Sequence, residues 1–281
     1  MSLKSRLHLL ARNFSRNLLK AVHTLSSSGY SFITINLNGE IFKFYTHYEG
    51  VLVINELLIL NQYNFVYRLK PRVTIDLGAH IGVFTISVAK NIIDLYGNGL
   101  VIAVEPNIVN YYTLVNNIKI NGVGKVVKAI KAAVASNQGF VEVEWIGIRD
   151  YVRTITMDSL IEIVRDEGYS EVDLVKIDIE GAELDILIND VNWLKYVKAL
   201  VMELHPQIYG LKGLKAIFKN LKKQGFNVIC VENIVDSRLA LLRWLRRVTP
   251  SPSWLIMTLW RLLITPIINE HRIRYFIAIK E

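Results

Sequence analysis

Cysteine is nearly absent from this sequence, with only Cys230 among 281 residues. A single thiol forms neither an internal disulfide nor a multi-cysteine metal site, so secreted disulfide-stapled domains and zinc fingers are excluded. Cys230 itself stands in an apolar stretch and is interpreted as a core residue. With 52% hydrophobic and 21% charged residues, the chain is not globally disordered. We expect a globular protein of a reducing compartment, the cytoplasm.

Acidic residues are missing from two segments, residues 1–39 and 237–269. Each segment holds five lysines or arginines, so ten of the 33 basic residues lie there, against 25 acidic residues in the whole chain. The net charge of +8 therefore comes from these two appendages, and the rest of the chain is nearly neutral. Because the main part carries no excess of positive charge, nucleic acid is not the partner that we expect.

Long apolar runs are also missing. Basic residues interrupt residues 3–25, which predict a basic amphipathic helix rather than a secretory signal, with an organelle transit peptide as the alternative. Residues 254–268 are apolar, but a bilayer span needs roughly 20 residues. We interpret residues 237–269 as an inserted helical element rich in arginine and tryptophan. Two roles stay open for it: contact with an anionic membrane surface, or an interface in a homo-oligomer.

From residue 72 onward, apolar runs typical of strands alternate with helical patterns, as in a parallel sheet covered on both faces. We therefore predict an α/β fold with a doubly wound, mostly parallel seven-stranded sheet. Before it, alternation around Asn38-Gly39 predicts a β-hairpin cap. The predicted domains are this cap, residues 1–71, and a main domain, residues 72–281. The predicted strands are residues 73–77, 100–104, 126–133, 174–179, 199–204, 227–231 and 274–279, and the predicted helices are residues 83–96, 109–121, 182–189 and 213–224.

The first predicted strand runs into the motif Asp76-Leu77-Gly78-Ala79-His80-Ile81-Gly82. Glycine at positions 78 and 82 allows a tight turn and close approach of a ligand. The spacing differs from Gly-x-Gly-x-x-Gly, which places a pyrophosphate at a helix N-terminus. An acid beside the turn suits a cation better than a phosphate, and S-adenosylmethionine (SAM) carries an ammonium and a sulfonium. We expect Asp76 to oppose that positive charge.

An acid also closes the second predicted strand, in the motif Val104-Glu105-Pro106. A carboxylate at this place accepts hydrogen bonds from both hydroxyls of a ribose. Glu105 therefore indicates a nucleoside ligand, although the feature alone does not separate SAM from NAD.

Four polar residues mark the ends of the fourth and fifth predicted strands. Alternation places Lys176 and Asp178 on one face of their strand, and Glu203 and His205 on one face of theirs. We predict His205 as the general base, and Lys176 as either a catalytic residue or an ion-pair partner. Glu183 is interpreted as a favourable charge in the first turn of a helix. A divalent ion bound by Asp178, Glu203 and His205 is an alternative that we do not predict.

These motifs together resemble the FkbM family of SAM-dependent methyltransferases, which has the class I methyltransferase fold. The resemblance covers about residues 72–206 and implies that the glycine turn surrounds the methionine part of SAM, that Glu105 holds the ribose, and that Ala132 and Ala133 lie near the adenine. His80 departs from the family pattern, which usually has asparagine there. The resemblance is carried by residues 75–82, 103–107 and 174–183 and by the pairs Asn116-Asn117 and Asn121-Gly122. The predicted cofactor-binding residues are Asp76, Gly78, Ala79, His80, Gly82, Glu105, Pro106, Ala132, Ala133 and Asp178.

We predict a SAM-dependent methyltransferase that methylates a hydroxyl of a sugar, a glycolipid or another small molecule and releases S-adenosylhomocysteine (SAH). His205 would accept the hydroxyl proton, oriented by Glu203 or Asp178. A lipid-linked glycan is the acceptor that a peripheral position on the inner face of a membrane implies. An RNA methyltransferase is disfavoured because residues 178–181 read Asp-Ile-Glu-Gly rather than Asn/Asp-Pro-Pro-Tyr/Phe, and an NAD enzyme is disfavoured by the glycine spacing. A non-catalytic, membrane-associated scaffold would bind no SAM.

Overall fold

The computed structural model describes residues 29–37, 39–59, 66–145, 148–231 and 274–280. The predicted helix over residues 3–25 and the predicted insertion at 237–269 lie outside the described residues. Of the helices in these ranges, none is long and apolar enough to cross a membrane. The chain divides into two compact units, residues 1–175 and 176–281.

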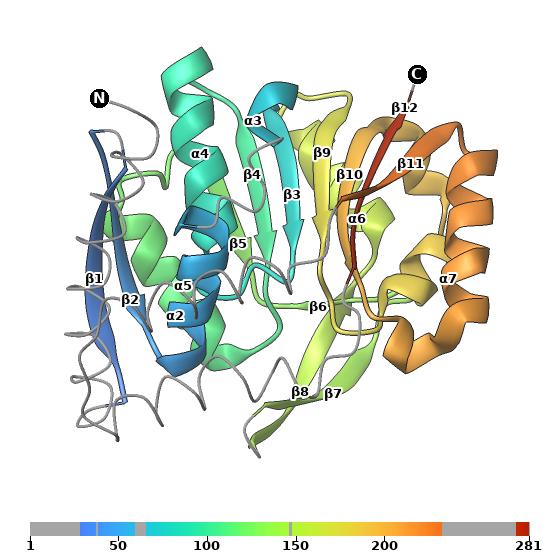
Figure 1. Cartoon of the computed structure of the whole chain (residues 1–281), viewed down its shortest axis with the longest axis horizontal. Coiled ribbons are helices and arrows are strands. Elements are labelled where there is room, and N and C mark those ends of the chain that lie inside the picture. The colour runs from blue at the N-terminus through green and yellow to red at the C-terminus, as the bar shows by residue number, and fades with distance from the viewer. Residues whose placement is uncertain (1–28, 38, 60–65, 146–147, 232–273, 281) are drawn as a thin grey trace, which may run out of the picture. The chain divides into compact units, whose positions relative to one another are not determined.

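Seven strands pair into one sheet in the order β11-β12-β10-β9-β3-β4-β5, which confirms the predicted fold class and strand number (Figure 1). β3, β4 and β5 pair in parallel, whereas β12 is antiparallel to β10 and β11. All residues of β3 and β4 are buried, as expected of parallel strands covered on both faces. The strands are β3 (Val73–Leu77), β4 (Leu100–Val104), β5 (Val127–Ile130), β9 (Val172–Ile177), β10 (Val197–Leu204), β11 (Phe226–Val231) and β12 (Arg274–Lys280).

A helix follows each of the first two strands of this sheet. α4 (Val83–Tyr96) begins after the glycine turn, and α5 (Ile108–Ile120) begins after Asn107. The Asn107 side chain accepts hydrogen bonds from the backbone N–H groups of Val109 and Asn110. Such an N-cap stabilises a helix by typically about 1 kcal/mol. Both helices therefore start at the carboxyl ends of their strands, the edge where open α/β sheets bind ligands.

The predicted hairpin is present as β1 (Ser31–Leu37) and β2 (Glu40–Thr46), which pair in antiparallel register. It lies beside α5, whose buried Asn117 exchanges hydrogen bonds with the backbone of Tyr45 and also donates to the carbonyl of Ile81 (Figure 1). One amide side chain thus joins the hairpin to the glycine turn. The inward-facing hairpin residues are Ile33, Ile35, Phe42 and Phe44. The chain then continues through α2 (Tyr48–Ile54), the π-helical η1 (Asn55–Ile59) and α3 (Val66–Leu69).

A three-stranded sheet of the first unit lies in a stretch for which the sequence pattern predicts no separate sheet. The prediction of one strand over residues 126–133 is wrong, because β5 ends at Ile130 and Ala133 pairs instead with Thr154. The hydrophobic run therefore serves two different sheets. Its strands, in chain order, are β6 (Ala133–Val134), β7 (Phe140–Trp145) and β8 (Ile148–Ile155), and β8 lies between the other two. The helix α6 (Met157–Asp166) follows β8 in the chain.

Two predicted helices of the second unit have different bounds in the structure. Residues 182–189 contain the π-helical η2 (Asp185–Asn189) instead of a regular α-helix, and the 3₁₀-helical η3 (Asn192–Tyr196) comes next. α7 (Pro206–Lys223) begins well before residue 213, because a kink at Gly210 breaks the periodicity that the prediction used. The helix packs on β11 and buries its apolar face there, through Leu214, Ile217 and Leu221.

Candidate functional site

The turn between β3 and α4 is the first part of the candidate site. Gly78 and Gly82 have positive φ angles of 73° and 88°. The backbone N–H groups of Gly78 and Ala79 both donate to the carbonyl of Val104 at 3.0 Å, which fixes the turn to the end of β4. A Cβ at position 82 would lie 2.5 Å from Cδ1 of Leu114. A side chain at this position would be strained at this φ and would need Leu114 to move.

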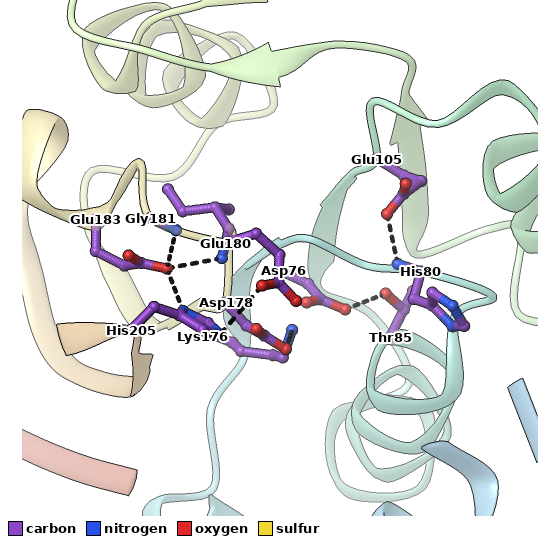
Figure 2. A network of polar contacts seen from close by, with 11 residues as sticks. Asp76, His80, Thr85, Glu105, Lys176, Asp178, Glu180, Gly181, Glu183 and His205 are labelled. Atoms are coloured by element: carbon purple, nitrogen blue, oxygen red, sulfur yellow. Dashed lines mark hydrogen bonds and ion pairs between the residues drawn. The ribbon is translucent and has the colours of Figure 1, made fainter. Parts of the chain in front are cut away.

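Asp76 lies on β3 directly before this turn and is fully buried. Its Oδ2 accepts a hydrogen bond of 2.6 Å from Oγ1 of Thr85, in the first turns of α4 (Figure 2). Burying a carboxylate is costly unless hydrogen bonds and positive charge compensate it. The position, burial and charge of Asp76 fit the predicted role, which is to oppose the ammonium of SAM.

Glu105, at the end of β4, is held by two backbone donors. Its Oε2 accepts from the N–H of His80 at 2.7 Å (Figure 2). Its Oε1 accepts from the N–H of Asn107 at 2.9 Å. Each carboxylate oxygen can accept two hydrogen bonds. The fixed orientation of Glu105 therefore fits the predicted bidentate contact with the two hydroxyls of a ribose.

His80 has a φ of 52°, in the left-handed region that few residues other than glycine adopt. Histidine and asparagine both enter this region more often than most residues other than glycine, so the turn accepts His80. The His80 ring lies edge-on to the ring of His47, with centroids 5.2 Å apart. Nε2 of His47 is in turn 2.9 Å from Oδ1 of the buried Asn110. His80 thus supports Glu105 through its backbone and contacts the hairpin side of the unit through its ring.

The other predicted cofactor residues of the first unit also lie at strand ends. Ala79 is in the turn after β3, Pro106 follows Glu105, and Ala132 and Ala133 come after β5. Because β3, β4 and β5 are parallel and adjacent, these residues share one edge of the sheet. We call Asp76, Gly78, His80, Gly82 and Glu105 the cofactor group. Its two fixed carboxylates and its glycine turn fit a cationic nucleoside such as SAM.

The second part of the candidate site belongs to the second unit and begins after β9. β9 ends at Ile177, so the predicted strand over residues 174–179 is wrong at its end and Asp178 lies in the following turn. Nζ of the buried Lys176 still pairs with Oδ2 of Asp178 at 3.4 Å. The turn continues through Glu180 and Gly181, whose φ angles are 52° and 105°. This left-handed pair reverses the chain and leaves the Glu180 side chain 82% exposed.

His205 follows β10 directly and is 2% exposed. Its Nδ1 is 2.9 Å from Oε1 of Glu183, and its Nε2 is 3.4 Å from Oε2 of Glu180 (Figure 2). Oε1 of Glu183 also accepts from the backbone N–H groups of Ile179 and Gly181, both at 3.2 Å. The imidazole is therefore oriented by a carboxylate that the backbone itself holds in place.

The charges around His205 change its protonation. Burial disfavours the charged imidazole and lowers its pKa, but the hydrogen bond to Glu183 and the negative charges of Glu180, Glu183 and Asp178 outweigh burial and raise the pKa to about 9. The backbone N–H of His205 donates to the hydroxyl of Tyr209 at 3.0 Å. Burial, and then the charge of Glu183, raise the pKa of Tyr209, which stays a neutral phenol. In this arrangement His205 is a cation at neutral pH.

The interpretation of Glu183 as a first-turn charge is incomplete. Glu183 stands two residues before η2, but it is fully buried and hydrogen-bonded to His205, a residue distant in the sequence. In the structure, Glu183 orients the imidazole of His205 through this hydrogen bond, whereas the sequence predicted Glu203 or Asp178 for this role. The only local signal was its place in the run Glu180-Gly181-Ala182-Glu183, whose left-handed turn points the carboxylate back to the strand end.

The predicted catalytic residues of the second unit lie together. One oxygen or nitrogen atom each of Asp178, Glu203 and His205 lies within 4.8 Å of the other two, and Lys176 pairs with Asp178. We call these four residues and Glu183 the polar cluster. Its carboxylates can accept hydrogen bonds from a hydroxyl, and its buried cations can hold a developing negative charge on oxygen.

Comparison with known proteins gives a family match. Residues 76–228, more than half of the chain, match the family model described as "Methyltransferase FkbM domain". The chain is also similar to a solved O-methyltransferase from Bacillus cereus in complex with SAH, with 13% identity, a TM-score of 0.47, and coverage of 83% of this chain and 90% of that chain. For the O-methyltransferase TomG from Streptomyces achromogenes in complex with SAM, these values are 9%, 0.48, 95% and 97%. No curated protein gives a match.

Proposed function

Because the chain belongs to the FkbM family of methyltransferases, whose cofactor is SAM, we propose that it methylates a hydroxyl group of a sugar or another small molecule. The observation that carries this proposal is the polar cluster, in which two carboxylates stand beside a buried His205 and Glu183 pair. Such carboxylates can accept a hydrogen bond from the hydroxyl of an alcohol substrate, and such cations can stabilise the negative charge that develops on its oxygen. The turn at residues 178–181 reads Asp-Ile-Glu-Gly, without the prolines typical of enzymes that methylate amino groups of nucleic acids.

The cofactor group supplies the binding of SAM. Asp76 would oppose the ammonium, and Glu105 would accept hydrogen bonds from the two ribose hydroxyls. When bound, SAM supplies a methyl group on a positively charged sulfur, which leaves as the neutral thioether of SAH. Glu105 needs no reorganisation for its contact, since His80 and Asn107 already fix the carboxylate.

The polar cluster would hold the acceptor. A hydroxyl that donates to Asp178 or Glu203 has its oxygen lone pairs directed away from the carboxylate and available for the methyl group. Positioning of this kind accounts for about 7–11 kcal/mol in well-oriented reactions, and removal of the proton adds typically about 10²–10⁴ in rate. His205 accepts that proton only in its neutral form, which is the minor form at neutral pH because its pKa is about 9.

A labelled-methyl experiment tests the proposed function. The protein is incubated with SAM that carries a tritiated methyl group and with fractions of host extract, and labelled products are identified by mass spectrometry. We expect one added methyl group per labelled product, on a hydroxyl-bearing small molecule and stable to alkali, as an ether is. Glu105→Gln should bind SAM roughly tenfold to hundredfold more weakly, since it loses charge-assisted hydrogen bonds. Asp185→Asn, which changes an acid bonded to Asn189 on η2, is the matched control.

Three results would contradict the proposal. Label found only on nitrogen atoms of nucleic acid would support an RNA methyltransferase instead. Absence of SAM binding in a calorimetric titration would support a non-catalytic protein. Label in an alkali-labile ester would move the acceptor from a hydroxyl to a carboxyl group.

A further inference from the structure

The polar cluster has the composition of a cation site. Asp178, Glu203 and His205 each offer one ligand atom, all within 4.8 Å of one another. Two ligands on opposite sides of a divalent ion lie about 4.0–4.6 Å apart, because metal–ligand distances are about 2.0–2.3 Å. A small rotation of the partly exposed Asp178 or Glu203 side chain would therefore bring the three ligand atoms to coordination distance from one ion.

His205 is oriented as a metal ligand usually is. Metal-binding histidines commonly donate the second ring N–H to a carboxylate, which fixes the tautomer and the ring orientation. Here Nδ1 faces Glu183 at 2.9 Å, so Nε2 is the nitrogen left for an ion. Glu183 is fully buried and is held by the backbone of Ile179 and Gly181. Within the described residues, its other oxygen, Oε2, is buried without a hydrogen-bond partner. A buried carboxylate of this kind is expected behind a positively charged centre.

The surrounding charges favour a cation. In the part of the chain that the structure describes, the carboxylates of Asp178, Glu180, Glu183 and Glu203 gather around His205, and the ammonium of Lys176 pairs with one of them. Lys176 contacts one oxygen of Asp178 and cancels about one of these charges. Oε2 of Glu180 lies 3.4 Å from Nε2, and rotation of this 82% exposed side chain toward solvent would clear the approach of an ion.

We propose that Asp178, Glu203 and His205 bind a divalent metal ion, and that the acceptor hydroxyl coordinates this ion during methyl transfer. Two carboxylates and one imidazole suit Mn²⁺ or Mg²⁺ better than a structural zinc, which prefers thiolates and several histidines. The second half of this proposal rests on the proposed function. As the oxygen–methyl bond forms, the sulfur–methyl bond breaks with its electrons going to sulfur, and the hydroxyl proton passes to water. The ion lowers the pKa of the hydroxyl and so takes over the activation that the sequence assigned to His205.

Mn²⁺ binding to the full-length, chelator-treated protein without SAM tests the site itself. Free Mn²⁺ is measured by electron paramagnetic resonance as protein is added. We expect saturable binding, at least tenfold weaker in Asp178→Asn and in Glu203→Gln, whose side chains keep their shape. Glu183→Gln should weaken binding about 10–100-fold without itself removing a ligand. Asp185→Asn is the control and should bind as the wild type does. Circular dichroism and the midpoint of thermal unfolding report that each variant is folded.

Two outcomes would overturn the site: no Mn²⁺ binding at millimolar concentration, or equal binding by the wild type and by all three variants. The labelled-methyl assay, run with chelator and with added Mn²⁺, separates this failure from failure of the proposed function. Methyl transfer to a hydroxyl that persists in chelator removes the metal from the mechanism and leaves the function standing. Mn²⁺ binding without methyl transfer to oxygen leaves the site standing and removes the function.

Discussion

Glu183 and His205 form a buried pair that loses its hydration but fixes the orientation of the imidazole. The two side chains are 0% and 2% exposed, so each loses nearly all contact with water. Three hydrogen bonds to Oε1 of Glu183, two of them from backbone N–H groups, replace the hydrogen bonds that this carboxylate would make with water. A pair held so firmly specifies which ring nitrogen faces the rest of the cluster. That choice of nitrogen is the property on which both the proposed chemistry and the proposed metal site depend.

The raised pKa of His205 predicts a loss of stability in alkali. In the metal-free protein its pKa is about 9, against 6.5 for an unperturbed histidine, so the stabilisation is complete below pH 6.5 and disappears as the pH rises to about 9. The shift corresponds to about 3 kcal/mol at most. Denaturant unfolding of chelator-treated protein, measured from pH 6 to 9.5, should show this decrease. Glu183→Gln should flatten the curve, and an equally steep curve in that variant would contradict the assignment to this pair.

At the scale of elements, α5 packs against the glycine turn and is hydrogen-bonded to it. Asn117 of α5 donates to the carbonyl of Ile81 within the turn and also bonds the backbone of Tyr45 on β2. Leu114, one helical turn earlier on α5, fills the space above Gly82. The turn that would hold SAM therefore has little freedom to adjust to a larger side chain.

Replacing Gly82 tests this packing. In Gly82→Ala, the new Cβ would lie 2.5 Å from Leu114 and the residue would keep a φ of 88°. We expect a loss of about 2–4 kcal/mol in the free energy of unfolding, from backbone strain and overpacking together, and weaker SAM binding. Gly97→Ala is the matched control, because its φ is 73° and no atom lies within 4 Å of the new Cβ. Equal losses in the two variants, with unchanged SAM affinity, would show that the turn is not tightly packed.

Local patterns predicted the elements whose limits are set locally. β3, β4 and α4 have the predicted bounds, because glycines and charged residues flank their apolar runs. The end of β9 could not be predicted, because the alternation of apolar and polar residues continues to Ile179, whereas the strand ends at Ile177. The split between β5 and β6 depends on pairing of Ala133 with Thr154, which no local signal encodes.

The candidate site shows the same division. The strand-end positions of Asp76, Glu105, Asp178 and His205 could be predicted, because each polar residue closes or follows a buried apolar run. The role of Glu183 could not, because it depends on a contact with a residue 22 positions away. The positive φ angle of Glu180 was likewise invisible, because glutamate rarely adopts this region, whereas histidine, as at position 80, enters it more often.

At the scale of the whole molecule, the uneven charge of the chain calls for a physical role. Ten of the 33 basic residues lie in residues 1–39 and 237–269, which contain no acid. The second of these segments also holds Trp244, Trp254 and Trp260, three of the five tryptophans. Tryptophan and arginine together are typical of contact with the headgroup layer of a membrane. A hydroxyl on a lipid-linked glycan would then be presented close to the enzyme.

Flotation with liposomes decides between this membrane contact and an interface between copies of the chain. We expect the full-length protein to float with vesicles that contain anionic lipid and to stay behind with neutral vesicles. Each basic residue near an anionic surface contributes about 1 kcal/mol, so replacing Arg243, Arg246 and Arg247 by Gln should weaken binding roughly 100-fold. The matched control replaces three exposed lysines of α7, Lys215, Lys219 and Lys222, by Gln and removes the same charge elsewhere. No flotation with either lipid, together with a dimer in sedimentation that the arginine variant abolishes, would assign the segment to self-association. If both triple variants lose membrane affinity equally, the binding depends on net charge alone and not on this segment.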